Sequence, residues 1–135
     1  MLSTSRLLFV LALVVFSAGA TSARADSIRE YCKGIVGESY SLMETCIRNE
    51  EQSRTRLQSR IADPKIESYC KGIVGKSYSL MVTCIRNEER SRANIQSRPT
   101  DPKIDAYCRS IVGESQSLME TCIRNEEEAK RRIGK

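Results

Sequence analysis

The chain contains no histidine and no tryptophan, and aromatic residues make up only 5% of its 135 residues. Histidine is the commonest general base of enzymes and the commonest metal ligand, so its absence disfavours proton-transfer and zinc chemistry. The six cysteines form no Cys-x-x-Cys pair, and a zinc site would need four ligands drawn from unusually spaced cysteines. We therefore expect no enzymatic activity, no metal and no cofactor.

Long apolar runs are missing except near the N-terminus. Leu7–Phe16 is an apolar run of 10 residues, whereas a membrane-spanning helix needs about 20. Arg6 precedes it, and the small-x-small sequences Ala18-Gly-Ala20 and Ala23-Arg-Ala25 follow it, in the order of a secretory signal. The sequence Ala23-Arg-Ala25-Asp26 resembles the end of a bacterial Sec signal. We predict a signal peptide over residues 1–25, cleaved after Ala25, with Ala20 as second choice and an uncleaved anchor as the alternative. The mature chain would have no transmembrane segment and would be periplasmic or secreted.

The chain also has no large excess of positive or negative charge. The chain has 22 basic and 17 acidic residues, and loss of Arg6 and Arg24 with the signal leaves 20 basic residues and a net charge of +3. Nucleic-acid binders concentrate Lys and Arg on one face, so we expect no nucleic-acid partner. Helices that lie on membranes need a Lys/Arg-rich polar face, and acids nearly balance bases here. Binding to an anionic surface is therefore the alternative rather than the first choice.

What the chain does contain is one unit three times over. Cys32, Cys70 and Cys108 are 38 residues apart, as are Cys46, Cys84 and Cys122, and the first two copies differ at 10 of 38 positions. Such a period is typical of repeat architectures in which each copy is one supersecondary element. We predict repeats over residues 26–65, 66–103 and 104–135.

The first half of each copy has the pattern of a short amphipathic helix. In the first copy Ile28, Tyr31, Cys32, Ile35 and Val36 follow i, i+3, i+4, i+7, i+8 spacing. Candidate helix starts are the capping box Ser27–Glu30 and the pairs Asp63-Pro64 and Asp101-Pro102. Candidate ends, where a left-handed residue is favoured, are Gly37, Gly75 and Gly113.

The second half predicts a longer helix that becomes polar. Ser41 and Ser117 begin sequences that fit capping boxes, and Leu42, Met43, Cys46 and Ile47 form the apolar stripe. The polar part offers ion pairs at i,i+4 spacing, namely Glu50–Arg54, Glu88–Arg92 and Glu126–Lys130. We expect this part to be solvated, with Leu57, Ile95 and Ile133 packing against a neighbouring unit.

The cysteines of each copy lie seven residues on either side of a serine-rich turn, at Ser39 in the first copy. Residues so placed face each other in an antiparallel helical hairpin. We predict the disulfides Cys32–Cys46, Cys70–Cys84 and Cys108–Cys122, with bonds between copies as the alternative. The hairpin resembles in architecture the coiled-coil-helix-coiled-coil-helix proteins of the mitochondrial intermembrane space. Those proteins carry two cysteine pairs per hairpin, with shorter spacing than the single pair here, so no residue role is carried over.

The predicted fold is all-α, with three tandem disulfide-stapled αα-hairpin repeats of 38-residue period after a cleaved signal peptide. A polar run that recurs unchanged in all copies is the candidate partner face, because multivalent display raises avidity. Its residues are Arg48, Asn49, Glu51, Arg86, Asn87, Glu89, Arg124, Asn125 and Glu127. We expect an exported, non-enzymatic protein-binding or structural module of the bacterial periplasm or envelope with an unknown protein partner. The alternative is a cationic, disulfide-stabilised protein that acts on membranes or the envelope.

Overall fold

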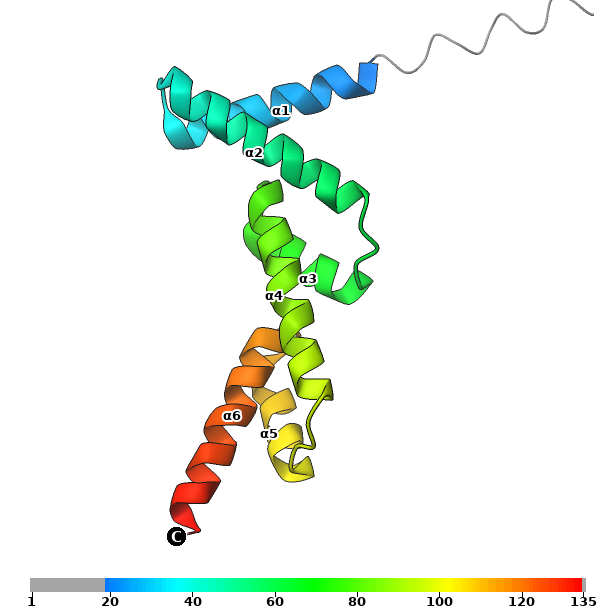
Figure 1. Ribbon diagram of the computed structural model, residues 1–135, viewed down its shortest axis with the longest axis vertical. Coiled ribbons are helices and arrows are strands. Elements are labelled where there is room, and N and C mark those ends of the chain that lie inside the picture. The colour runs from blue at the N-terminus through cyan, green and yellow to red at the C-terminus, as the bar shows by residue number, and fades with distance from the viewer. Residues whose placement is uncertain (1–18, 135) are drawn as a thin grey trace, which may run out of the picture. The chain divides into compact units, whose positions relative to one another are not determined.

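The structure, a computed structural model, describes residues 19–134, which form α-helices and no strand. The helices, shown in Figure 1, are α1 (Gly19–Val36), α2 (Tyr40–Gln58), α3 (Pro64–Val74), α4 (Tyr78–Gln96), α5 (Pro102–Val112) and α6 (Gln116–Ile133). The predicted all-helical fold with disulfides at repeat spacing is confirmed. The apolar segment Leu7–Phe16 of the predicted signal peptide lies outside the described residues.

The chain divides into two compact units, Met1–Arg48 and Asn49–Lys135, whose boundary falls inside α2. The described part of the first unit is α1 and the beginning of α2. The second unit holds the rest of α2 together with α3 to α6.

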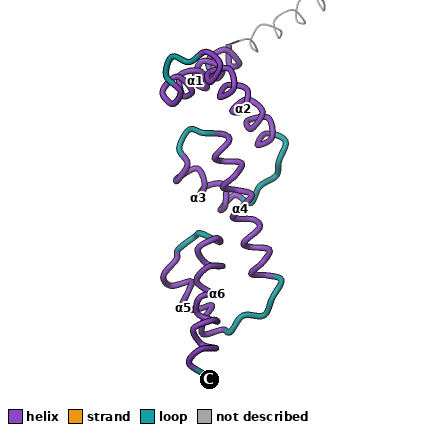
Figure 2. Tube along the Cα trace, turned by 60° about the vertical axis from the view of Figure 1, so that its left-hand side comes forward, coloured by secondary structure: helices purple, strands orange, loops and turns teal. Residues whose placement is uncertain are grey.

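Each repeat is a helical hairpin closed by one disulfide. The bonds are Cys32–Cys46, Cys70–Cys84 and Cys108–Cys122, and the two Cα atoms are 5.8 Å apart in each. In the second unit α3 packs against α4 and α5 against α6, with a short loop between the helices of each pair (Figure 2). The predicted pairing within copies is the pairing that the structure has.

The boundaries of the short helices follow from local sequence. Asp63 and Asp101 cap α3 and α5 by accepting hydrogen bonds from the backbone N–H groups of Lys65 and Lys103, at 2.9 and 2.8 Å. Proline at the first helical position costs no hydrogen bond there. The helices end before Gly37, Gly75 and Gly113, whose φ angles are 64°, 64° and 65°. These predicted starts and ends are confirmed.

The predicted start of the first helix is wrong. Helix α1 begins at Gly19, so Ser27 lies inside the helix and does not cap it. The residues before Ser27 contain no proline to stop a helix, unlike the linkers before α3 and α5.

The long helices begin two residues earlier than the capping boxes at Ser41 and Ser117 predicted. The caps of α4 and α6 are Ser77 and Ser115, whose hydroxyls accept from the N–H groups of Leu80 and Leu118, both at 3.2 Å. The N3 position of these helices is therefore leucine, which leaves the partner of an ordinary capping box missing.

The second unit has two small cores, each completed from the preceding repeat. One consists of Ile66, Cys70 and Ile85, against which Leu57 of α2 packs. The other consists of Cys108, Met119 and Ile123, against which Ile95 of α4 packs. The expectation of contact with a neighbouring repeat is confirmed for Leu57 and Ile95 and wrong for Ile133, which is 86% exposed. Helix α4 also packs along α6.

Candidate functional site

The recurring Arg-Asn-Glu-Glu run divides between the surface and the interior. Its arginines and asparagines are exposed in every copy: Arg48, Asn49, Arg86, Asn87, Arg124 and Asn125. The first glutamate is buried in two copies, since Glu50 is 3% exposed and Glu88 is 5% exposed. The second glutamate is exposed at Glu51 and half-buried at Glu89 and Glu127. The prediction that this part of the helix is solvated is therefore wrong for its inner edge.

Glu50 caps the first helix turn of the following repeat. Its carboxylate accepts hydrogen bonds from the Ser77 hydroxyl at 2.9 Å, the Tyr78 backbone N–H at 2.6 Å and the Ser79 hydroxyl at 2.6 Å. All four residues belong to the second unit. The tail of α2 thus holds the start of α4 by a single side chain.

Glu88 makes the same contacts one repeat later. It accepts from the hydroxyls of Ser115 and Ser117 at 3.1 and 2.6 Å, and from the backbone N–H groups of Gln116 and Ser117 at 2.5 and 3.3 Å. Tyr78 of the second copy is replaced by Gln116 in the third. The hydrogen bond to the glutamate is kept, because the backbone N–H of this residue donates it.

Helix electrostatics explains why a carboxylate is stable in this position. The first N–H groups of a helix lack partners within the helix, and the helix dipole favours a negative charge at that end. A capping box satisfies such groups with an acid from the same helix. Here the acid comes from the preceding repeat, so that capping and repeat-to-repeat contact are one interaction.

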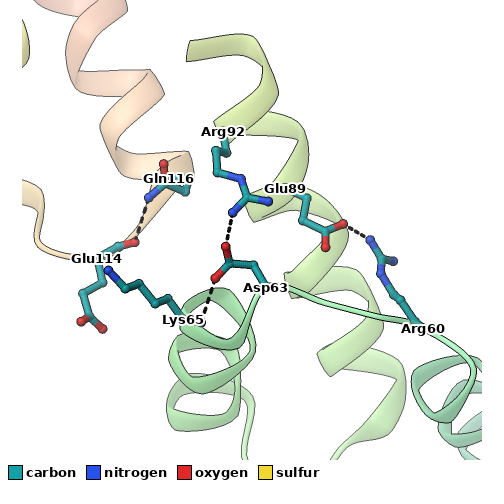
Figure 3. A network of polar contacts seen from close by, with 7 residues as sticks. All are labelled: Arg60, Asp63, Lys65, Glu89, Arg92, Glu114 and Gln116. Atoms are coloured by element: carbon teal, nitrogen blue, oxygen red, sulfur yellow. Dashed lines mark hydrogen bonds and ion pairs between the residues drawn. The ribbon is translucent and has the colours of Figure 1, made fainter. Parts of the chain in front are cut away.

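Further charged contacts surround the start of the short helices (Figure 3). Asp63 binds Arg92 at 2.5 Å as well as the Lys65 N–H. The hydrogen bond from Lys65 and that from Arg92 lower the pKa of the Asp63 carboxyl. Asp101 binds Lys130 and the Lys103 N–H in the same way, and its pKa is lowered for the same reasons, with Lys130 the larger cause.

These contacts correct the predicted i,i+4 ion pairs. Arg92 and Lys130 were expected to pair with Glu88 and Glu126, but they bind Asp63 and Asp101 across the hairpin. The predicted pairing overlooked that the tail of each long helix runs beside the start of its own short helix.

The second glutamate of the run fixes the linker in the later copies. Glu89 binds Arg60 (Figure 3), and Glu127 binds Arg98 at 3.8 Å. Arg60 and Arg98 occupy equivalent positions in the two linkers. Two of the nine predicted face residues therefore already have partners within the chain.

A polar contact specific to the last joint connects α4 and α6. Glu120 accepts a hydrogen bond from the Asn94 side chain at 2.9 Å. Its pKa is lowered, first by a hydrogen bond from Ser91 and then by Asn94 and the neighbouring arginines Arg124 and Arg98. The corresponding residue of the second copy is Val82, so the two joints differ in this detail.

An apolar tip on every hairpin is the feature that sequence reasoning missed. The isoleucine before the turn is 61%, 60% and 57% exposed at Ile35, Ile73 and Ile111, and the leucine after it is 55%, 52% and 54% exposed at Leu42, Leu80 and Leu118. Both had been assigned to the apolar stripes. Their position between the disulfide and the turn could have indicated this exposure, because a two-helix hairpin has no further element at its tip to cover them.

The described residues hold no obvious chemical centre. Within residues 19–134 no group of three metal-ligating side chains is placed to hold an ion, and no helix is long and apolar enough to cross a membrane. Comparisons of the chain with protein-family models, curated proteins and solved structures found no match. Evidence on function therefore comes from the surface of the repeats.

Proposed function

We propose that the chain is an exported, non-enzymatic repeat protein of the bacterial periplasm or envelope that binds a protein partner through its three hairpin tips. The observation that carries this proposal is the exposure of the tip isoleucine and leucine to nearly the same extent in all copies. Exposed apolar side chains that lie together are typical of interaction surfaces, and here the same two are exposed on each copy. Export is supported by the signal-like residues 1–25 and by disulfides, which persist in oxidising compartments.

The polar face continues from each tip along the same helix. Leu42 and Asn49 are seven residues apart, which places them on one edge of α2, and Arg48 is adjacent. Both polar residues are exposed in every copy. An apolar centre with a polar rim is the usual composition of a protein interface. We include Arg48, Asn49 and their equivalents in the proposed contact surface.

Capture from an envelope extract with two matched variants tests this proposal. The bait is the oxidised protein, compared with a triple tip variant (Leu42→Gln, Leu80→Gln, Leu118→Gln) and a triple face variant (Arg48→Gln, Arg86→Gln, Arg124→Gln). We expect a stoichiometric partner that the tip variant loses and the face variant retains more weakly, with unchanged melting temperatures. Capture unaffected by either variant contradicts the proposal, and binding to anionic vesicles without any protein partner favours the membrane-active alternative.

A further inference from the structure

The two ends of the repeat array are complementary halves of the joint that connects its repeats. Each joint has a receiving side, the first turn of a long helix, and a presenting side, the tail of the preceding long helix. Both joints lie within Asn49–Lys135 and use the same contacts. Among residues 19–134, none contacts the receiving side of the first repeat or the presenting side of the third in this way.

The receiving side of the first repeat is uncovered. Tyr40 is 92% exposed, whereas Tyr78 in the joined position is half-buried. Ser39 is half-buried, whereas its equivalent Ser77 is 2% exposed, and Ser41 is exposed, whereas its equivalent Ser79 is half-buried. The triplet Ser39-Tyr40-Ser41 is identical in sequence to the triplet that Glu50 binds at the first joint.

The uncovered area is localised. Ile28 and Cys32 are buried in the first repeat, as Ile66 and Cys70 are in the second. Ile47, however, is half-buried, whereas its equivalents Ile85 and Ile123 are at most 1% exposed. The first repeat thus lacks cover at the serine triplet and at Ile47.

The presenting side of the third repeat carries the matching groups. Glu126 stands where Glu50 and Glu88 stand in the earlier copies, and no hydrogen bond or ion pair to it is found among the described residues. Ile133 is 86% exposed, whereas Leu57 and Ile95, its equivalents, pack into the core of the next repeat. A carboxylate and an aliphatic side chain are thus presented with the spacing that the two joints use.

We propose that a second copy of this chain completes both ends, with Glu126 and Ile133 of one copy docked on Ser39–Ser41 and Ile47 of the next. Glu126 would accept from the Ser39 and Ser41 hydroxyls and the Tyr40 N–H, as Glu50 does from its triplet. The contact joins different surfaces of the two copies, so each pair of copies still has one free side at either end, to which further copies add in a row or close a ring. The tip leucine Leu42 directly follows this triplet, but its equivalents Leu80 and Leu118 remain 52% and 54% exposed beside the two existing joints, so the joint does not cover the tip leucine.

Sedimentation over a range of concentrations tests this self-association with the oxidised, exported protein. We expect mass to rise continuously with concentration beyond that of a dimer. Glu126→Gln should lower the association constant about tenfold or more, because it removes a charged acceptor of several hydrogen bonds. The control Glu67→Gln removes one negative charge at an exposed site in α3 of the middle repeat and should leave association unchanged.

Photo-crosslinking places the contact directly. A benzophenone side chain in place of Tyr40, which is exposed and so tolerates the change, should crosslink to residues 126–133 of another copy in mixtures of light- and heavy-isotope chains. The tip variant should self-associate like the unmodified protein even if its partner is lost. A protein that stays monomeric, a dimer unaffected by Glu126→Gln, or crosslinks elsewhere would each overturn the proposal.

Discussion

Glu88 is a charged side chain placed between two repeats, and four hydrogen bonds compensate the loss of its hydration. Burial of an unpaired carboxylate is strongly unfavourable. Two of its partners are backbone N–H groups that would otherwise lack an acceptor at the helix start. The residue therefore stabilises the joint only while the next repeat is folded, which couples the folding of neighbouring repeats.

Replacement of Glu88 by alanine should destabilise the protein, whereas the same change at Glu126 should not. Glu88→Ala leaves Gln116, Ser115 and Ser117 without their acceptor, and we expect a loss of about 1.5–3 kcal/mol in the free energy of unfolding. Glu126→Ala removes an equivalent residue to which no described residue donates a hydrogen bond, so a change within about 0.5 kcal/mol is expected. Urea denaturation of dilute protein, followed by circular dichroism, measures both. Equal losses would contradict the assigned role of Glu88.

Acid should weaken the contacts that the Asp63 carboxylate makes with the Lys65 N–H and Arg92. The folded-state pKa of this carboxyl is lowered from its ordinary value of 3.8 because the Lys65 N–H and Arg92 bind its charged form. A carboxyl with a lowered pKa contributes stability that is complete above the unfolded value and is lost as the pH falls through the folded one. Asp63→Asn keeps a residue suited to the cap but removes the charge.

The expected result is a difference in melting temperature between the parent and Asp63→Asn that is constant near neutral pH. It should narrow as the pH falls below 3.8. Glu44→Gln, which removes an exposed carboxylate outside these contacts, controls for overall charge. A difference that stays constant into strong acid would show that the charge of Asp63 plays no part.

Among the elements, the short helices are fixed by their ends rather than by their interiors. Asp63-Pro64 starts α3, and Gly75 ends it with a φ of 64°. Gly72 lies inside the same helix, where glycine has no such role. A glycine inside the helix, which weakens it, is thus followed three residues later by a glycine that the helix end requires.

The same substitution should have opposite effects at these two glycines. Gly72→Ala should stabilise by about 0.5–1 kcal/mol, because alanine favours the helix and no atom lies within 4 Å of the new Cβ. Gly75→Ala should destabilise by about 1 kcal/mol or more, since its left-handed backbone disfavours any Cβ although the space is equally open. Thermal melts of the two variants measure this. The same sign of change in both would contradict the assigned helix end.

Disulfide reduction should lower the stability of every hairpin. Each bond joins cysteines 14 residues apart, and closing a loop of this size contributes about 3 kcal/mol in the chain-entropy account. The cores are small, as expected for units of this length. Circular dichroism in reductant should show a large fall in melting temperature with some helix retained. An unchanged melt would mean that the joints between repeats suffice.

The sequence predicted the hairpins well because their signals are local. Proline and glycine mark helix ends within a few residues, and the repeat removed most of the ambiguity in cysteine pairing. The joints were missed because their partners are 27 to 29 residues apart, and the i,i+4 arginine offered Glu50 a nearer one. A signal was present: Cys46, Glu50, Ser53 and Leu57 follow i, i+4, i+7, i+11 spacing, which places the glutamate on the buried stripe.

For the whole molecule, three similar tips on one chain predict multivalent binding. Removal of one tip by Leu42→Gln, of two by adding Leu80→Gln, and of three by adding Leu118→Gln should reduce affinity for the captured partner in successive steps. Each linked site raises the effective concentration for the next, so the combined loss should exceed tenfold. Surface-immobilised partner and the series of full-length variants measure this. Affinity that depends on one tip alone would show that the copies do not act together.

Each repeat carries both halves of the joint within a single long helix, the serine triplet at its start and the glutamate at its tail. In-frame duplication of one 38-residue segment of the gene would therefore create a new joint whose two sides already match. Loss of a segment would bring together two sides that also match. Unequal recombination could thus lengthen or shorten the array without any compensating substitution, and the number of repeats is a quantity that inheritance can change in one event.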